Sequence, residues 1–155
     1  MTAENTIHIE LLQRADYRFE ARFDASTIPP LLTDEGPPVG TGQGPSPAQL
    51  LGTAVANCLA ASLLFAMRKY RNEPGPLRAV AQVREGRNEH KRLRILAIDV
   101  DLHLGVPASQ IQSLDRILAQ FEDFCVVTQS VRAAIPVGVR VIDGDAQVLA
   151  VPQAA

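Results

Sequence analysis

The longest apolar segment of the sequence runs from Ser46 to Met67 and predicts a long helix. Ser46 fits the N-cap, and Pro47 fits the first helical position, where its missing N–H costs no hydrogen bond. Alanine and leucine, both good helix formers, fill the body, and no further proline occurs before Pro74. We therefore expect a helix over residues 46–72 at the centre of the domain, buried on most of its circumference.

Two faces of this predicted helix differ in side-chain size. A bulky ridge repeats every fourth residue and consists of Leu51, Val55, Leu59, Leu63 and Met67. Gly52, Ala56 and Ala60 form a smooth strip beside it, where another backbone could approach closely. The apolar run is long enough to span a membrane. We expect a core helix and no membrane, because the rest of the chain has the composition of a soluble domain.

Alternation of apolar and polar residues predicts the strands. They are expected over residues 6–12, 17–23, 77–85, 93–104, 137–141 and 147–151. The first two are close enough to form an antiparallel hairpin, with a turn near residues 14–16. Residues 24–45 are rich in proline and glycine and predict a flap without regular structure; a disordered linker is the alternative.

Two further helices are expected in the second half of the chain. Residues 107–121 have the apolar periodicity of an amphipathic helix. Asp123 is a candidate cap for a second helix that contains Cys125 and ends before Pro136. The order of strands, helix, strands, helices and strand indicates an α+β fold, with antiparallel sheets packed around the long helix.

Composition narrows the functional classes. The 155 residues suit a single domain, residues 1–155, and the formal net charge of −2 gives no general attraction to nucleic acid. A basic cluster consists of Arg84, Arg87, Lys91, Arg92 and Arg94. Glu85 and Glu89 interrupt it, so a solvated hairpin tip is favoured over a nucleic-acid site. The first residues form no export signal, which favours the cytoplasm and two reduced thiols.

The two cysteines are the main candidates for chemistry. Both are expected in helical segments with apolar neighbours, which is also typical of inert buried thiols. A functional pair would need Cys58 close to Cys125, and Cys125 would gain from a helix N-terminus. The three histidines, His8, His90 and His103, are scattered over separate strands. We therefore expect no metal site and no cofactor.

Two segments of the chain resemble the OsmC/Ohr family. The first is Gly44–Leu51 followed by Asn57-Cys58-Leu59, similar to the family's Pro-x-x-Leu-Leu helix start with a cysteine about ten residues on. The second is Phe124–Arg132 before Ile135-Pro136-Val137, similar to the family's second-cysteine segment. The strand and helix order agrees along nearly the whole chain.

The resemblance implies an intertwined α+β homodimer with active sites at the subunit interface. It also implies a thiol peroxidase for organic hydroperoxides. Cys58 would become a sulfenic acid, Cys125 would resolve it as a disulfide, and a dithiol reductant would restore the pair.

The sequence departs from the family pattern at one position. Ala48 stands where family peroxidases carry a glutamate that fixes an arginine beside the thiolate. Arg14 is the positional candidate for this arginine, and Glu35 for the carboxylate. The departure favours one alternative, a non-catalytic protein that binds a small apolar ligand at the dimer interface. A plain dimerisation scaffold is a third hypothesis.

Overall fold

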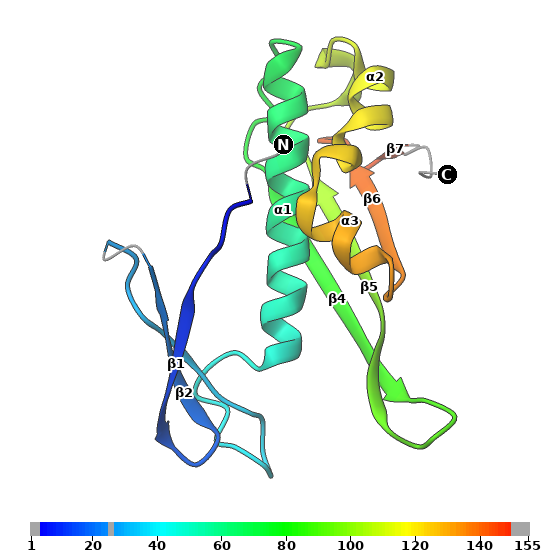
Figure 1. Cartoon of the computed structure of the whole chain (residues 1–155). Helices are drawn as coiled ribbons and strands as arrows, with labels where there is room; N and C mark the ends of the chain where they lie inside the picture. Colours follow the sequence, from blue (N-terminus) through cyan, green and yellow to red (C-terminus); the bar gives the residue numbers. More distant parts are fainter. Residues whose placement is uncertain (1–3, 25–26, 150–155) are drawn as a thin grey trace. The chain divides into compact units, whose positions relative to one another are not determined.

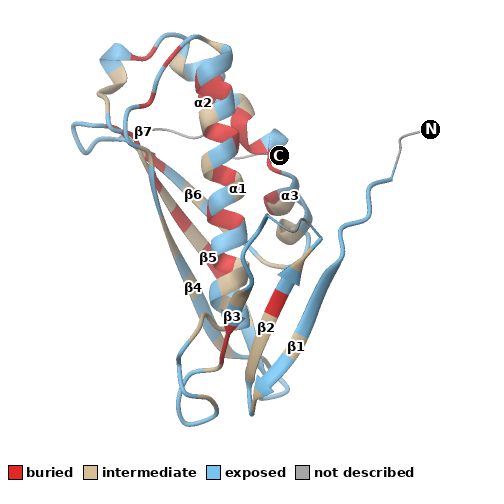
Figure 2. Cartoon of the chain, turned by 90° about the vertical axis from the view of Figure 1, so that its left-hand side faces the viewer, coloured by how far each residue is buried: buried red, intermediate tan, exposed pale blue. Residues whose placement is uncertain are grey.

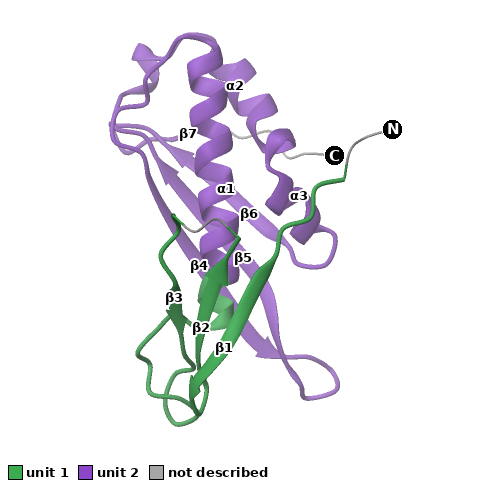
Figure 3. Ribbon diagram, turned by 60° about the vertical axis from the view of Figure 1, so that its left-hand side comes forward, with its two compact units in different colours: residues 1–50 green, residues 51–155 purple. Residues whose placement is uncertain are grey.

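The computed structural model describes residues 4–24 and 27–149, and the chain forms two compact units (Figure 3). Unit 1 covers residues 1–50 and unit 2 covers residues 51–155. Unit 1 contains β1 (Ile9–Ala15), β2 (Arg18–Phe23), β3 (Leu31–Thr33) and the first turn of α1 (Pro47–Lys69). Unit 2 contains the rest of α1, β4 (Arg78–Arg87), β5 (Leu93–His103), η1 (Ala108–Gln110), α2 (Leu114–Gln120), η2 (Phe121–Phe124), α3 (Val126–Arg132), β6 (Val137–Ile142) and β7 (Val148–Leu149). Residues 150 and 151 of the last predicted strand lie outside the described residues.

The predicted first hairpin is confirmed as the antiparallel pair β1–β2 of unit 1. The turn lies at residues 16–17, later than expected, so Arg14 belongs to β1 and not to the turn. Asp16 makes this tight connection possible by adopting a positive φ of 43°, a conformation that aspartate tolerates better than most residues.

The flap is more ordered than its proline and glycine content predicts, and β3 is a correction to that prediction. Leu31–Thr33 pairs antiparallel with β2, with Thr33 opposite Phe19. Pro29 and Pro30 end just before these three residues, which therefore keep all their N–H groups for pairing. Beyond β3, the buried Asp34 carboxylate accepts hydrogen bonds from three backbone amides and the Thr41 hydroxyl.

The predicted helix is confirmed as α1, although it ends at Lys69 rather than near residue 72. Its start is a capping box: Gln49 N–H donates to Ser46 Oγ at 3.3 Å, and Ser46 N–H donates to Gln49 Oε1 at 2.8 Å. This cap satisfies two backbone groups, so the helix begins where the sequence predicts.

The ridge of α1 is the centre of the core of unit 2. Val55, Leu59, Leu63 and Met67 are fully buried (Figure 2). The smooth strip allows close approach, because a Cβ on Gly52 would lie 2.6 Å from Val83 Cγ2 of β4. Length and composition alone would let α1 span a membrane, with a mean hydropathy of 1.9, but its ridge packs into this protein core.

The prediction of a buried core helix is confirmed for α1, but one side of the helix is exposed in the single chain. Its buried residues are Gly52, Val55, Ala56, Leu59, Ser62, Leu63, Ala66 and Met67. Asn57, Ala61 and Phe65 lie on an exposed side instead. Apolar composition all round the helix therefore does not mean that one subunit covers it all round.

The sheet of unit 2 is mixed, which corrects the expectation of purely antiparallel sheets. Its order is β4-β5-β6-β7, with β4–β5 and β6–β7 antiparallel and β5–β6 parallel. Parallel neighbours need a long crossover. Here α2 and α3 provide it, on the same side of the sheet as α1 (Figure 1).

The predicted helix over residues 107–121 is divided into η1, α2 and η2. Ser113 has a positive φ of 58°, which interrupts the helical backbone before α2. The apolar face is nevertheless as expected, since Ile111, Ile117, Leu118 and Phe121 are buried. The buried side chains therefore agree with the apolar periodicity of the sequence, even though the backbone does not form one continuous helix.

Asp143 organises the turn between β6 and β7 and gives a testable pH dependence. Backbone amides of Ala108 and Gln147 lower the pKa of this carboxyl by hydrogen bonding to its charged form. A lowered native pKa adds stability that is complete above the ordinary carboxyl pKa of about 3.9 and is lost as the pH falls through the native pKa.

We therefore expect Asp143→Asn to lower the urea midpoint at pH 7, and the difference from the parent to close below about pH 4. Asp145→Asn, an exposed carboxylate in the same turn, is the matched control. A difference for Asp143→Asn that stays constant down to pH 3 would contradict this role.

Candidate functional site

Cys58 lies at the midpoint of α1, and its side chain is only partly exposed. It packs against the core cluster that the α1 ridge forms with the sheet. The rigid, 23-residue helix fixes this thiol in place. A small molecule that reaches the surface of α1 can still contact it.

Cys125 lies between η2 and α3 and is completely buried. It is the N-cap residue of α3, with φ −83° and ψ 91°, so two predictions fail here. Cys125 is not inside a helix, and Asp123 is not the cap of α3. The physical reason is η2, which continues through Asp123 to Phe124 and delays the start of α3 by two residues.

The structure brings the two thiols together, which sequence spacing alone did not establish. The thiols of Cys58 and Cys125 lie close enough to interact, and α3 lies beside α1 in Figures 1 and 3. Burial raises the pKa of Cys125, and the interaction with the Cys58 thiol raises it further. The pair therefore consists of a partly accessible thiol and a buried thiol that holds its proton.

Thr128 is a third member of this site that sequence reasoning did not identify. Its side chain is fully buried, and its Oγ1 lies 2.9 Å from Cys125 Sγ in a shared hydrogen bond. The hydroxyl and backbone amide of Thr128 lower the pKa of Cys125, against the larger effects of burial and Cys58. The signal was a threonine three residues after a capping cysteine, a spacing that brings N-cap and N3 side chains together.

This contact gives a prediction for Cys125. We expect Thr128→Val, a nearly isosteric change, to raise the pKa of the Cys125 thiol, because a contact that lowers it is removed. The measurement is the ultraviolet absorbance of the thiolate against pH in a Cys58→Ala background.

Thr128→Ser keeps the hydroxyl and is the control for this change. A titration midpoint in Thr128→Val equal to or below that of Thr128→Ser would contradict the assigned effect.

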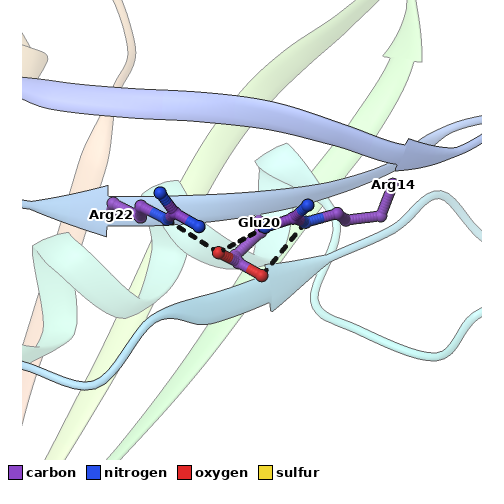
Figure 4. A network of polar contacts seen from close by, with 3 residues as sticks. All are labelled: Arg14, Glu20 and Arg22. Carbon is purple, nitrogen blue, oxygen red and sulfur yellow. Dashed lines mark hydrogen bonds and ion pairs between the residues drawn. The ribbon is translucent and has the colours of Figure 1, made fainter.

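Arg14 and Glu35 both lie in unit 1. Arg14 donates from Nε and Nη2 to the two carboxylate oxygens of Glu20, at 3.1 and 2.9 Å, and Arg22 donates to the same carboxylate at 2.8 Å (Figure 4). These contacts raise the pKa of Arg14 and lower that of Glu20. The carboxylate partner of Arg14 is therefore Glu20 and not Glu35. Glu35 forms no ion pair within residues 4–24 and 27–149.

Two cavities lie in unit 1. One, of about 470 Å³, is lined by flap residues and the start of α1, including Gln43, Ser46 and Gln49. The other, of about 300 Å³, lies between Tyr17 and the flap residue Val39. No group of three His, Cys, Asp or Glu side chains suitable for a metal ion occurs in the described part of the chain.

Comparison with known proteins identifies the family of this chain. A family model described as OsmC-like protein matches residues 40–140, a range that includes both cysteines. No curated protein gives a significant match to the sequence.

Solved structures give close matches of fold at low identity. An OsmC-like protein of Vibrio cholerae superposes with a TM-score of 0.75 at 14% identity, covering 90% of this chain and 100% of that one. An OsmC-like protein of Mycoplasma pneumoniae gives 0.73 at 14% identity, with 91% and 99% coverage. The organic hydroperoxide resistance protein OhrB of Bacillus subtilis gives 0.65 at 15% identity, with 88% and 98% coverage.

Proposed function

Because the chain belongs to the OsmC-like family, we propose that it is a thiol-dependent peroxidase that reduces organic hydroperoxides through Cys58 and Cys125. The observation that carries this proposal is the contact between a partly accessible thiol and a buried, protonated one. Similarity to hydroperoxide resistance proteins supports it at the level of the fold.

The first step of the proposed reaction takes place at Cys58. Its thiolate attacks one peroxide oxygen, so that an S–O bond forms and the O–O bond breaks. The leaving alkoxide takes up a proton and becomes an alcohol. Cys58 is oxidised to a sulfenic acid, and the hydroperoxide is reduced by two electrons.

The second step uses the proton and the sulfur of Cys125. The Cys125 sulfur attacks the Cys58 sulfur, an S–S bond forms, and the S–O bond breaks. The proton from Cys125 leaves with the hydroxide as water. A dithiol reductant then returns two electrons by thiol–disulfide exchange, which we place in the cytoplasm.

We also propose supporting roles for two charged residues, Arg14 and Glu20. Arg14 remains the candidate cation for the Cys58 thiolate, and its contacts with Glu20 would fix its guanidinium as the family glutamate does. Glu20 takes this supporting role more readily than Glu35, because Glu20 already holds Arg14.

We also propose that the active unit is a homodimer. Large apolar side chains beside the thiol pair are exposed in the single chain: Phe65 (61%), Phe124 (52%) and Val126 (75%). A second copy of the chain would remove this apolar area from water. Sedimentation velocity should give twice the monomer mass, and a monomeric mass at micromolar concentration would refute the dimer.

The second candidate is a non-catalytic protein that binds a small apolar ligand. Ala48 favours it, because an alanine at the family glutamate position cannot fix an arginine. Under this hypothesis the thiols stay free in the presence of peroxide, and a ligand remains bound through native purification.

Intact mass after one equivalent of cumene hydroperoxide, measured with free thiols blocked under denaturing conditions, separates the two candidates. The peroxidase should lose two hydrogens, and its peptide map should contain a Cys58–Cys125 linkage. Two blockable thiols after exposure would favour the ligand-binding protein.

A further inference from the structure

An ion pair spans the turn that carries Cys125. Arg132, the last residue of α3, places its Nη2 2.5 Å from Oε2 of Glu122 in η2. Both side chains are shielded, with exposed fractions of 27% for Arg132 and 11% for Glu122. The pair therefore closes a loop of chain with Cys125 inside it.

The same two residues make further bonds to the backbone around Cys125. The Glu122 carbonyl oxygen accepts hydrogen bonds from Cys125 N–H and from the Gln129 side-chain amide, each at 3.0 Å. Arg132 Nη2 also donates to the carbonyl oxygen of Val137, the first residue of β6, at 3.4 Å. Glu122 and Arg132 thus connect the Cys125 backbone to both α3 and the sheet.

Stability alone gives a weak reason for such a pair. Shielded ion pairs lose much of their Coulomb energy to desolvation, and well-packed apolar residues often replace them without loss. The need to hold the local backbone in place gives a stronger reason for the pair. Short helices such as the four-residue η2 and the seven-residue α3 hold their shape poorly without tertiary contacts.

We propose that the Glu122–Arg132 pair is a clamp that positions the Cys125 sulfur for its attack on the oxidised Cys58. This inference rests on the proposed function and concerns its second step only. Glu122 and Arg132 are positioning residues: they act through the backbone of Cys125 and take no part in the transfer of electrons or protons.

The test uses the variant Glu122→Gln, which keeps the size of the side chain and removes its charge. It measures the formation of the sulfenic acid and the formation of the disulfide separately. Rapid quenching after one equivalent of cumene hydroperoxide follows Cys58 sulfenic acid by dimedone trapping and the disulfide by the loss of two hydrogens. We expect disulfide formation to slow at least about tenfold, because a displacement of reacting groups by about 1 Å can slow a reaction about a hundredfold. Formation of the sulfenic acid should stay within about twofold of the parent.

Two further variants distinguish positioning from loss of stability. Arg132→Lys keeps the positive charge and should slow disulfide formation less than Arg132→Gln does. Asp101→Asn removes the carboxylate of the Arg140–Asp101 pair, which has a similar contact of 2.6 Å between β5 and β6, and should change neither step. Equal slowing by Asp101→Asn, or a parent rate in Glu122→Gln, would overturn the clamp.

The clamp can also fail independently of the peroxidase. Diamide, a thiol oxidant that is itself reduced to a hydrazine, forms the Cys58–Cys125 disulfide without peroxide. If the parent forms it with diamide and not with hydroperoxide, the peroxidase proposal fails. Glu122→Gln should still slow the diamide reaction about tenfold if the clamp exists, and a parent rate with diamide would refute it.

Discussion

Replacing Cys58 by serine is expected to lower the rate of hydroperoxide reduction at least about a thousandfold. A serine hydroxyl at neutral pH is a poor nucleophile towards peroxide oxygen, and without an activating base it does not replace a thiolate. The measurement is the consumption of cumene hydroperoxide with a dithiol reductant present.

Cys125→Ser is the matched control for this change, because it leaves the attacking sulfur in place. It should still form a sulfenic acid at Cys58, which dimedone traps, while no disulfide appears. A Cys58→Ser protein that reduces hydroperoxide at the parent rate would show that the thiol pair is not the reacting group.

The second large effect is on stability. Phe121 is completely buried in η2, four residues before Cys125, and truncation of such a core phenylalanine costs about 3–5 kcal/mol. We therefore expect Phe121→Ala to lower the free energy of unfolding by this amount in chemical denaturation at pH 7. The loss has two sources, the apolar area returned to water and the cavity left behind.

Leu93→Ala provides the control, because Leu93 is not part of the apolar face proposed for the homodimer. Leu93 of β5 is 57% exposed, so its truncation should cost less than about 0.5 kcal/mol. Equal losses for the two variants would contradict the assigned core.

Sequence periodicity predicted the parts of the fold that depend on local signals. The Ser46 cap and the apolar ridge that recurs every fourth residue of α1 are such signals, and the structure confirms both. The β4–β5 hairpin is another, since its two strands follow each other directly in the sequence.

The failures have long-range causes. β3 exists because β2 offers an unpaired edge, and no property of Leu31–Thr33 alone predicts that. The parallel pairing of β5 with β6 depends on a helical crossover. The contact of Cys58 with Cys125 depends on how α3 packs beside α1. In each case the deciding partner is distant along the chain.

The distance along the chain between Cys58 and Cys125 also affects how the protein acquires its thiol pair during synthesis. β4–β5 is a local hairpin and can form early, whereas β6 must wait for the crossover that carries Cys125. Until then a newly made chain has two isolated thiols, each open to oxidants without its partner nearby. We therefore expect the newly made chain to need a reducing environment until the pair forms, because the proposed chemistry requires both thiols in their reduced state.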